Sequence, residues 1–354
     1  MDCLKVLPET LEVLRKHKVE REKLIHGHVD PPIMVECDFK DGTWGEPKLV
    51  PYHSLSLDPS TKVLHYAQGI FEGMKAYYVN KKGPYIFRPE DNYTRLLTSS
   101  DRLDIPPLPK EIFMDSIQGF VKHSAKYIPE ETNHSLYLRP FIIATESGLG
   151  ARTSTEFKFI IIGKHCKPYF SEEDGVPVYL ERDFGRVGAG CTGSAKAMGN
   201  YASGMKVDRE ARENGYNITL WLDASEGRYI EELSGMNFFC VLGKTILTPA
   251  LNDSILPGIT RDSVITLARD MGYEVKEIDI EINELLCLNA EECNEMFGCG
   301  TTATIMPIRY LGEKDGSMFV PRYGKGPITT KLKEALLDIQ EGRSVDPYSW
   351  VKKV

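Results

Sequence analysis

The spacing of hydrophobic and polar positions predicts a chain of mixed helices and strands. In the first half, strand-like runs of β-branched and aromatic residues lie between turn residues, and helical segments follow proline. One predicted helix opens with Pro89 and two acids, which suits a first helical turn, and directs Leu96 and Leu97 toward a core. The elements expected here are helices at 8–17, 89–103 and 109–127 and strands at 33–37, 85–87, 135–145 and 157–163.

The second half has the same mixture of elements without an internal sequence repeat. Strands are expected near 217–222, 237–242, 245–248, 274–279 and 294–297, and helices near 200–214, 260–272, 281–289 and 327–340. The polar, turn-rich segment 166–177 is predicted to be an interdomain linker. A chain of 354 residues is too long for one ordinary core. We therefore predict two α+β or α/β domains, a smaller one at 1–165 and a larger one at 178–354, and not a Rossmann fold.

Composition narrows the classes of function. The formal net charge of -8 argues against a nucleic-acid-binding surface. The eight cysteines are scattered without a C-x-x-C pair, which predicts reduced thiols and no metal site. The first residues carry several glutamates and no uninterrupted apolar stretch, and no apolar run approaches the roughly 20 residues that span a bilayer. We expect a cytoplasmic protein without membrane contact.

Lys196 is the only charged residue between Arg186 and Lys206, and its neighbours are unusually small. Small residues leave room for a flat ring against the backbone. They also keep water from the ammonium, which lowers its pKa and makes it a nucleophile. A lysine that forms a Schiff base with an aldehyde cofactor needs both properties. The segment equally suits a lysine on a flexible Gly/Ser loop, so the pattern alone leaves both interpretations open.

An aldehyde cofactor with a phosphate tail, such as pyridoxal phosphate, also needs an acid beside its ring nitrogen and an anion cradle. Glu231 and Glu232 precede a turn into an apolar strand, and either carboxylate suits the ring nitrogen. The loop 252–262 enters a predicted helix whose first amides, those of Ile259 and Thr260, can bind an anion. A solvated acidic pair and a plain turn are the alternatives.

Two other segments offer contacts to phosphate. A predicted turn at 297–304 carries free amides and the hydroxyls of Thr301 and Thr302. Arg95, on the helix after Pro89, can form a bidentate contact, although an isolated helical arginine is more often a surface residue.

Several segments, in one order, resemble branched-chain-amino-acid aminotransferases of the class IV, fold type IV pyridoxal phosphate enzymes. The similarity runs from about Leu24 onward. It implies a two-domain fold like that of D-amino-acid aminotransferase, with the active site at the domain interface. The segments that carry it are 64–77, 87–89 with Arg95, 135–140, 196–201, 232–237, 255–261 and 297–301.

The resemblance implies a role for each matching residue, with pyridoxal 5'-phosphate as the cofactor and no metal. Lys196 is the catalytic lysine that bonds the cofactor, and Glu232 is the partner of the ring nitrogen. Tyr201 forms a hydrogen bond with the ring hydroxyl oxygen of the cofactor. The phosphate is held by Arg95, the amides of Ile259 and Thr260, and Thr301. The substrate site is lined by Tyr66, Phe71, Tyr137, Arg139, Tyr169 and the Thr301–Thr302 turn.

The implied reaction is ping-pong transfer of the amino group of L-leucine, L-isoleucine or L-valine to 2-oxoglutarate, which gives branched-chain 2-oxo acids and L-glutamate. Aromatic walls suit the aliphatic side chain, and Arg139 suits the second carboxylate of glutamate. A strand arginine paired to a structural acid is the alternative for Arg139. The resemblance also implies a homodimer in which a partner loop completes each pocket and Tyr66 acts across the boundary.

Rival interpretations stay within and outside this fold. A D-amino-acid aminotransferase or an aminodeoxychorismate lyase would share the fold, and a non-catalytic phosphate-ligand binding protein would share only the pocket. A dinucleotide enzyme is disfavoured because no G-x-G-x-x-G follows a strand.

Three positions depart from the family pattern. Gly235 replaces a hydroxyl residue of many relatives, so one hydrogen bond near the cofactor is expected to be missing. The turn after Thr301 lacks the cysteine pair of mammalian relatives, so no thiol redox switch is expected there. His26 stands where some relatives have an aromatic pocket residue, and it is either a tuning group or a solvated histidine.

Overall fold

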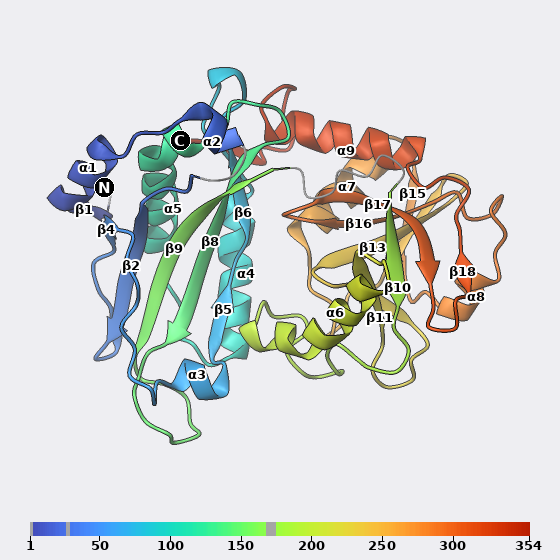
Figure 1. The fold of residues 1–354 in the computed structure, drawn as a ribbon, viewed down its shortest axis with the longest axis horizontal. Coiled ribbons are helices and arrows are strands. Elements are labelled where there is room, and N and C mark those ends of the chain that lie inside the picture. The colour runs from blue at the N-terminus through green and yellow to red at the C-terminus, as the bar shows by residue number, and fades with distance from the viewer. Residues whose placement is uncertain (1–2, 26–28, 168–174) are drawn as a thin grey trace. The chain divides into compact units, whose positions relative to one another are not determined.

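The computed structural model describes residues 3–25, 29–167 and 175–354, which form two compact units (Figure 1). Unit 1 comprises Met1–Pro168, Ala195–Gly199 and Asp338–Val354, and unit 2 comprises Tyr169–Ser194 and Asn200–Leu337. This grouping differs from the predicted ranges 1–165 and 178–354, because two later segments pack with the N-terminal part. Residues 168–174 of the predicted linker lie outside the described residues.

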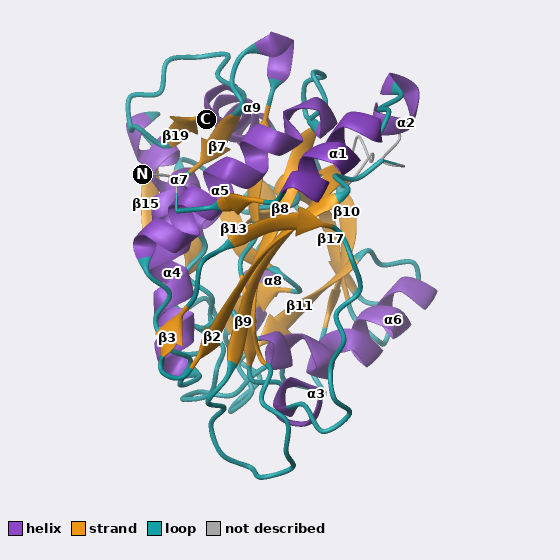
Figure 2. Cartoon of the chain, turned by 90° about the vertical axis from the view of Figure 1, so that its left-hand side faces the viewer, coloured by secondary structure: helices purple, strands orange, loops and turns teal. Residues whose placement is uncertain are grey.

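Unit 1 is built on a ten-stranded sheet in the order β1-β4-β2-β9-β8-β6-β7-β19, with β3 paired to β2 and β5 to β8. Figure 2 shows the long, twisted strands β2 and β9 side by side, and they run antiparallel. The strands are β1 (Lys5–Val6), β2 (Ile33–Lys40), β3 (Thr43–Trp44), β4 (Lys48–Pro51), β5 (Gly69–Phe71), β6 (Met74–Tyr77), β7 (Tyr85–Phe87), β8 (Ser135–Ala144), β9 (Phe157–Cys166) and β19 (Val351–Lys353).

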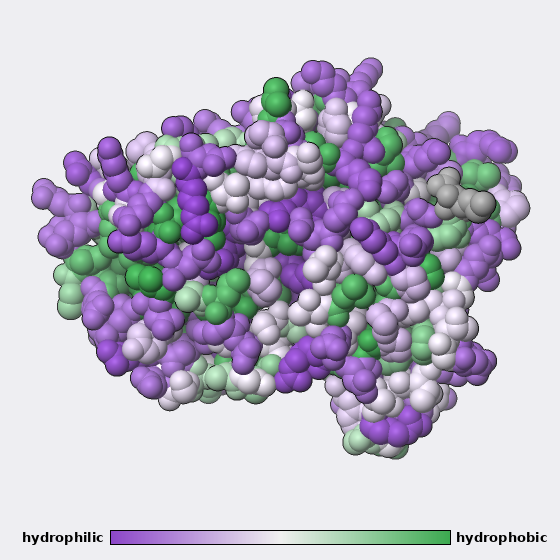
Figure 3. Space-filling view, turned by 180° about the vertical axis from the view of Figure 1, so that it is seen from behind, coloured by the Kyte–Doolittle hydropathy of each residue, from purple (hydrophilic) through white to green (hydrophobic). Residues whose placement is uncertain are grey.

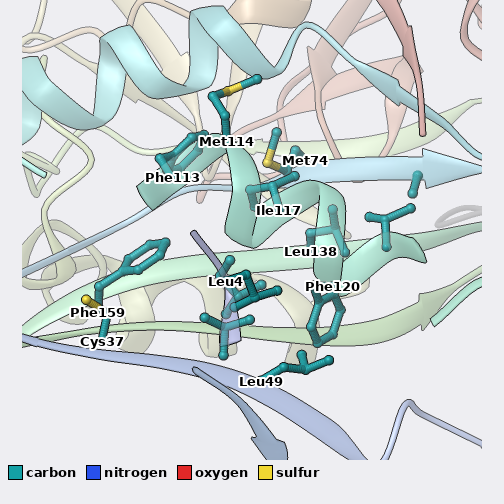
Figure 4. Packing of buried hydrophobic residues seen from close by; sticks show 14 of the residues in the cluster. Leu4, Cys37, Leu49, Met74, Phe113, Met114, Ile117, Phe120, Leu138 and Phe159 are labelled. Carbon is teal, nitrogen blue, oxygen red and sulfur yellow. The ribbon is translucent and has the colours of Figure 1, made fainter. Parts of the chain in front are cut away.

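Helices pack against this sheet, and the core of unit 1 is formed by buried side chains of both the helices and the strands. They are α1 (Pro8–Lys16), α2 (Arg21–Ile25), α3 (Lys62–Tyr66), α4 (Pro89–Arg102) and α5 (Lys110–Ser124), with the 3-10 helices η1 (Val79–Lys81) and η2 (Ala125–Tyr127). Phe113, Ile117 and Phe120 of α5 follow the i, i+4, i+7 spacing, so they share one face. Figure 4 shows this face against Leu138 of β8 and Phe159 of β9. Burying each such side chain stabilises the unit by roughly 1.5–3 kcal/mol.

Unit 2 contains a nine-stranded sheet in the order β12-β11-β10-β17-β16-β13-β14-β15, with β18 paired to β17. A further pairing of β12 with β13 closes six of these strands into a ring. The strands are β10 (Val176–Leu180), β11 (Ile218–Leu222), β12 (Ile230–Leu233), β13 (Met236–Leu242), β14 (Thr245–Pro249), β15 (Glu274–Ile278), β16 (Glu295–Gly300), β17 (Thr304–Gly312) and β18 (Met318–Phe319). The helices are α6 (Met205–Glu213), α7 (Ile259–Asp270) and α8 (Ile282–Leu286), with most of η3 (Met198–Gly204) and of α9 (Pro327–Gln340).

Three predicted elements need correction. The helix expected at 200–214 is an α-helix only from Met205, because η3 with its glycines and small residues precedes it. The helix expected at 281–289 is the five-residue α8. The turn expected at 297–304 begins only at Thr301, since Phe297–Gly300 pairs with both neighbours as part of β16.

The surface is mixed in polarity (Figure 3), and the cysteines, all of which are among the described residues, form no disulfides. On the face in Figure 3, hydrophobic residues occur in small groups among hydrophilic ones. Within the described ranges, no helix combines the length and the apolar character that a bilayer crossing needs. The eight cysteines are free thiols. Over the same ranges, no cluster of three or more His, Cys, Asp and Glu is arranged to hold a metal.

Candidate active site

Phe71, at the end of β5, brings two of the candidate residues of unit 1 together. The Nζ atom of Lys196 lies 4.9 Å from the centroid of the Phe71 ring, and the guanidinium carbon of Arg139 lies 4.4 Å from it. The Lys196 backbone is fixed on both sides, because its carbonyl accepts from the Phe71 amide at 3.1 Å and its amide donates to Ser99 Oγ at 2.9 Å. The half-buried lysine is therefore held on the sheet of unit 1 and not on a flexible loop.

Arg139 and Tyr137 form a second contact of the same group. Both point to one face of β8, where Arg139 Nη2 donates to the Tyr137 hydroxyl at 3.0 Å. A Cβ atom at Gly73 would lie 2.3 Å from that hydroxyl, so the glycine makes room for the tyrosine. Arg139 Nε is buried without a partner, and no ion pair to an acid forms at Arg139 within the described part of the chain. Among these residues, Arg139 is therefore not paired with a structural acid, which was the alternative interpretation of this residue.

Arg95 is not a surface residue. It is buried on α4, and its guanidinium meets the fully buried Glu72 in a fork, with Nε–Oε1 at 2.8 Å and Nη2–Oε2 at 2.7 Å. Asn92 and the Gly73 amide also donate to the Glu72 carboxylate. Such a buried, hydrogen-bonded pair gives the arginine a fixed orientation. Glu72 was not among the residues predicted from the sequence, although an acid between Phe71 and Gly73 in an apolar segment is a sign of a buried partner.

In unit 2 the structure distinguishes the two neighbouring acids of β12. Glu232 Oε1 lies 2.6 Å from Arg186 Nη2, and this pair is largely buried. Glu231 instead accepts from the Ser254 hydroxyl, and burial raises its pKa. A partner for a protonated ring nitrogen must be an ionised carboxylate, and a close guanidinium favours that form. Glu232 meets this requirement better than Glu231.

Arg186 is a residue that sequence reasoning missed. Its Nη2 atom also donates to the Ser254 carbonyl, so one guanidinium joins the Glu232 carboxylate to the loop before α7. The only sequence sign was its position as the last charge before the small-residue run.

The start of α7 lies beside Glu232. Asn237, which pairs with Glu232 across the β12–β13 turn, donates through Nδ2 to the Leu256 carbonyl at 3.0 Å. A Cβ atom at Gly258 would lie 2.1 Å from the Asn237 side chain, so only glycine allows this approach. Gly258 is the N-cap of α7, and no side chain caps this helix. The amides of Ile259 and Thr260 are thus at a helix terminus that attracts anions.

The Thr301–Thr302 turn begins directly after Gly300, which lies against the same hairpin. It follows β16, and a Cβ atom at Gly300 would lie 3.1 Å from the Gly235 carbonyl. Gly235 has a φ of 77°, which a residue with a side chain adopts only with strain. A hydroxyl residue at this turn would therefore carry a conformational cost here.

The remaining candidates are placed as follows. Tyr201 lies in η3 and is partly exposed. Tyr66 ends α3, and its hydroxyl donates to the Leu149 carbonyl. Tyr169 and His26 lie outside the described residues.

The residue types that pyridoxal 5'-phosphate requires are present, some in each unit. Unit 1 carries a lysine on an aromatic ring and a buried, oriented arginine, and unit 2 carries a carboxylate paired with a guanidinium and a helix start without a side-chain cap. The donor set therefore fits the cofactor. In unit 1, Lys196 is the candidate for its aldehyde carbon and Arg95 a candidate for its phosphate. In unit 2, Glu232 is the candidate for its ring nitrogen, and the α7 amides are candidates for its phosphate.

Comparisons with known proteins point to one family. A family model described as amino-transferase class IV matches residues 69–311. Branched-chain-amino-acid transaminase 1 of Bacillus subtilis (strain 168) is 37% identical over 354 residues, which is 99% of this chain and 99% of that protein.

Solved structures agree with this match. The branched-chain amino acid aminotransferase from Escherichia coli aligns with a TM-score of 0.72 at 28% identity, and the alignment covers 90% of this chain and 99% of that one. A second solved branched-chain amino acid aminotransferase, with pyridoxamine 5'-phosphate, aligns with a TM-score of 0.73 at 28% identity, over 90% of this chain and 98% of that one.

Proposed function

This chain belongs to the class IV aminotransferase family, and from that premise we propose that it is a branched-chain-amino-acid transaminase. The enzyme takes the amino group of L-leucine, L-isoleucine or L-valine and passes it to 2-oxoglutarate, which yields L-glutamate. Enzymes of this family use pyridoxal 5'-phosphate, which withdraws electrons from the substrate Cα while it is bound. The structural observation that best supports the proposal is that Lys196 and Arg139 both lie against the ring of Phe71.

Each side chain has a task in this proposal. Lys196 would take the proton from the substrate Cα as general base and then donate a proton, as general acid, at the carbon that was the cofactor's aldehyde carbon. Glu232, paired with Arg186, would keep the ring nitrogen protonated. Tyr201 bonds the ring hydroxyl, and Thr301 with Arg95 and the α7 amides holds the phosphate.

The substrate side has a double requirement, since one pocket accepts both an aliphatic side chain and a carboxylate. Phe71 and Tyr137 offer apolar ring surface, with Tyr66 and Tyr169 as further members. The Thr301–Thr302 turn is proposed to bind the α-carboxylate. Arg139 stands on the Phe71 ring with its Nε buried and without a partner, so an incoming carboxylate would complete its hydrogen bonds.

The substrate class is tested by the choice of amino donor. With 2-oxoglutarate as acceptor, L-leucine is expected to react and to give L-glutamate and 4-methyl-2-oxopentanoate. D-alanine is not expected to serve as an amino donor. The yellow colour of the purified protein, which comes from the bound cofactor, should also bleach when L-leucine is added without an acceptor. A preference for D-alanine would instead indicate a D-amino-acid aminotransferase, and no reaction with either donor would favour a non-catalytic binding protein.

Arg139→Gln is expected to separate the two substrates. Loss of a charge-assisted contact to carboxylate costs about 1.5–3 kcal/mol, which corresponds to a fall of roughly 10- to 100-fold in kcat/KM for glutamate. Leucine in its own half-reaction makes no side-chain ion pair and should change by less than about threefold. Stopped-flow measurement of both half-reactions in the same variant provides its own control. Equal losses for leucine and glutamate would contradict the assignment.

We further propose a cytoplasmic homodimer in which Tyr66 acts across the subunit boundary. The free thiols agree with a reducing compartment. Light scattering on the purified protein measures the mass directly, and a monomeric mass with full activity would contradict the dimer.

A further inference from the structure

The loop between β8 and β9, residues 145–156, is tied to α3 by a buried lysine. Lys62, the first residue of α3, has a side chain that is only 2% exposed. Its Nζ atom donates to the carbonyls of Arg152 and Thr153, at 3.2 and 3.3 Å. It also lies 3.4 Å from Glu146 Oε1. One ammonium therefore contacts both the beginning and the end of the loop.

Glu146 completes this contact from inside the loop. Its carboxylate accepts from both terminal nitrogens of Arg152 and from the amide and hydroxyl of Thr155. These bonds, led by the Thr155 amide, lower the pKa of Glu146 to about 2. The carboxylate is consequently charged at neutral pH and holds the two branches of the loop together. Lys62 is the cation through which that closed loop is joined to α3.

The other end of α3 contacts the tip of the same loop. The Tyr66 hydroxyl donates to the Leu149 carbonyl, and just before α3 the Ser60 carbonyl and hydroxyl accept from the Gly148 amide. The helix is only one turn long and is too short to be stable by itself. The direction of Tyr66 thus depends on where the loop lies.

Apolar packing contributes little to this arrangement. Of residues 145–156 only Ser154 is buried, and the side chains of Leu64 and Leu149 are mostly exposed. A buried ammonium is costly to desolvate, and an apolar residue of similar volume would often be as stable. Stability alone therefore does not account for a lysine at this position, whereas a need for one defined loop position does.

We propose that Lys62 is a positioning residue for the substrate: through the 145–156 loop it fixes Tyr66, without touching the substrate. This inference rests on the proposed function, in which Tyr66 lines the substrate site. It implies that Lys62 acts on the KM for the amino acid and that its effect passes through Tyr66.

The test is a double-substitution cycle with Lys62→Met and Tyr66→Phe. Methionine keeps the length of the side chain and removes the charge, and phenylalanine keeps the ring and removes the bond to Leu149. Each single variant is expected to raise the KM for L-leucine roughly tenfold with kcat within about threefold, since a displaced positioning group weakens binding more than chemistry. The double variant should be no worse than the poorer single variant, because residues in one chain of contacts are not additive.

Lys40→Met is the matched control. Lys40 pairs with Glu156 at the end of the same loop at 3.1 Å, but this pair is exposed and should contribute little. Its kinetics and the amide hydrogen exchange of residues 145–156 are expected to remain those of the unchanged protein. In Lys62→Met, the exchange of the same amides should become at least about tenfold faster.

Two further variants keep the test decisive. Lys62→Arg retains the charge, and its KM for L-leucine is expected to lie between those of the unchanged protein and Lys62→Met. If Lys62→Met does not fold, Arg152→Gln provides the second route, because it removes the contact of Arg152 with Glu146 at an exposed position. Multiplying effects in the double variant, or unchanged exchange of the loop in Lys62→Met or Arg152→Gln, would overturn the inference. If the unchanged protein does not transaminate leucine, the proposed function fails, while the exchange measurement still decides whether Lys62 holds the loop.

Discussion

Replacing Lys196 with alanine is expected to abolish transamination. The amine is the group proposed to move the Cα proton, and the contacts of the Lys196 backbone with Phe71 and Ser99 fix the position from which it acts. Loss of a general acid–base group alone costs roughly 10²–10⁴-fold, and the loss of the covalent attachment adds to this. The rate with leucine and 2-oxoglutarate should fall below detection, and borohydride should no longer fix the cofactor to the chain.

Lys206→Ala is the appropriate comparison for this variant. Lys206 is the next lysine along the chain, its side chain is exposed, and its ion pair with Glu210 is a weak surface contact at 3.9 Å. It should retain normal activity and normal borohydride labelling. Full activity in Lys196→Ala would contradict the role of Lys196, and so would borohydride labelling of a different lysine at full yield in that variant.

Replacing Glu232 with alanine is expected to leave cofactor binding intact while largely abolishing the half-reaction. Without the carboxylate, the ring nitrogen loses its proton and no longer accepts electrons from Cα. Removal of one such preorganised electrostatic partner costs roughly 10²–10³-fold in rate. Single-turnover absorbance changes with L-leucine measure the rate, and the absorbance of the bound cofactor after gel filtration measures retention.

The adjacent acid supplies the control for Glu232. Glu231 accepts a hydrogen bond from the Ser254 hydroxyl, and the amide oxygen introduced by Glu231→Gln can accept the same bond. This variant should keep a rate within about fivefold, because the hydrogen bond is preserved. Near-normal kinetics in Glu232→Ala, or a larger loss in Glu231→Gln, would exchange the roles of the two acids.

The sequence was informative wherever a local rule decides the structure. The acids after Pro89 correctly marked the start of α4, and the polar loop before Ile259 correctly marked the start of α7. The family, fold and cofactor followed from the resemblance of several segments to class IV aminotransferases, and the comparisons confirm them. The roles of individual site residues stay predictions that the variants above address.

What the sequence did not reveal depends on pairs that are distant in the chain. Glu72 and Arg95 are 23 residues apart, and Arg186 and Glu232 are 46 apart, so no spacing rule connects them. The neighbouring acids Glu231 and Glu232 differ only in what packs against them. Short strands such as β5 and β6 escaped prediction because the glycines at 69 and 73 interrupt the usual alternation, and these glycines are present to admit Met198 and Tyr137.

The pairing of β19 with β7 has a consequence for how the molecule is made. Val351 lies opposite Phe87, so unit 1 cannot complete its sheet until the whole of unit 2, which lies between them in the chain, has been synthesised. During translation, the edge of β7 must wait without its neighbour, a state in which an unpaired strand can recruit a strand from another nascent chain. Slow elongation through the second unit would therefore prolong the interval in which aggregation competes with folding.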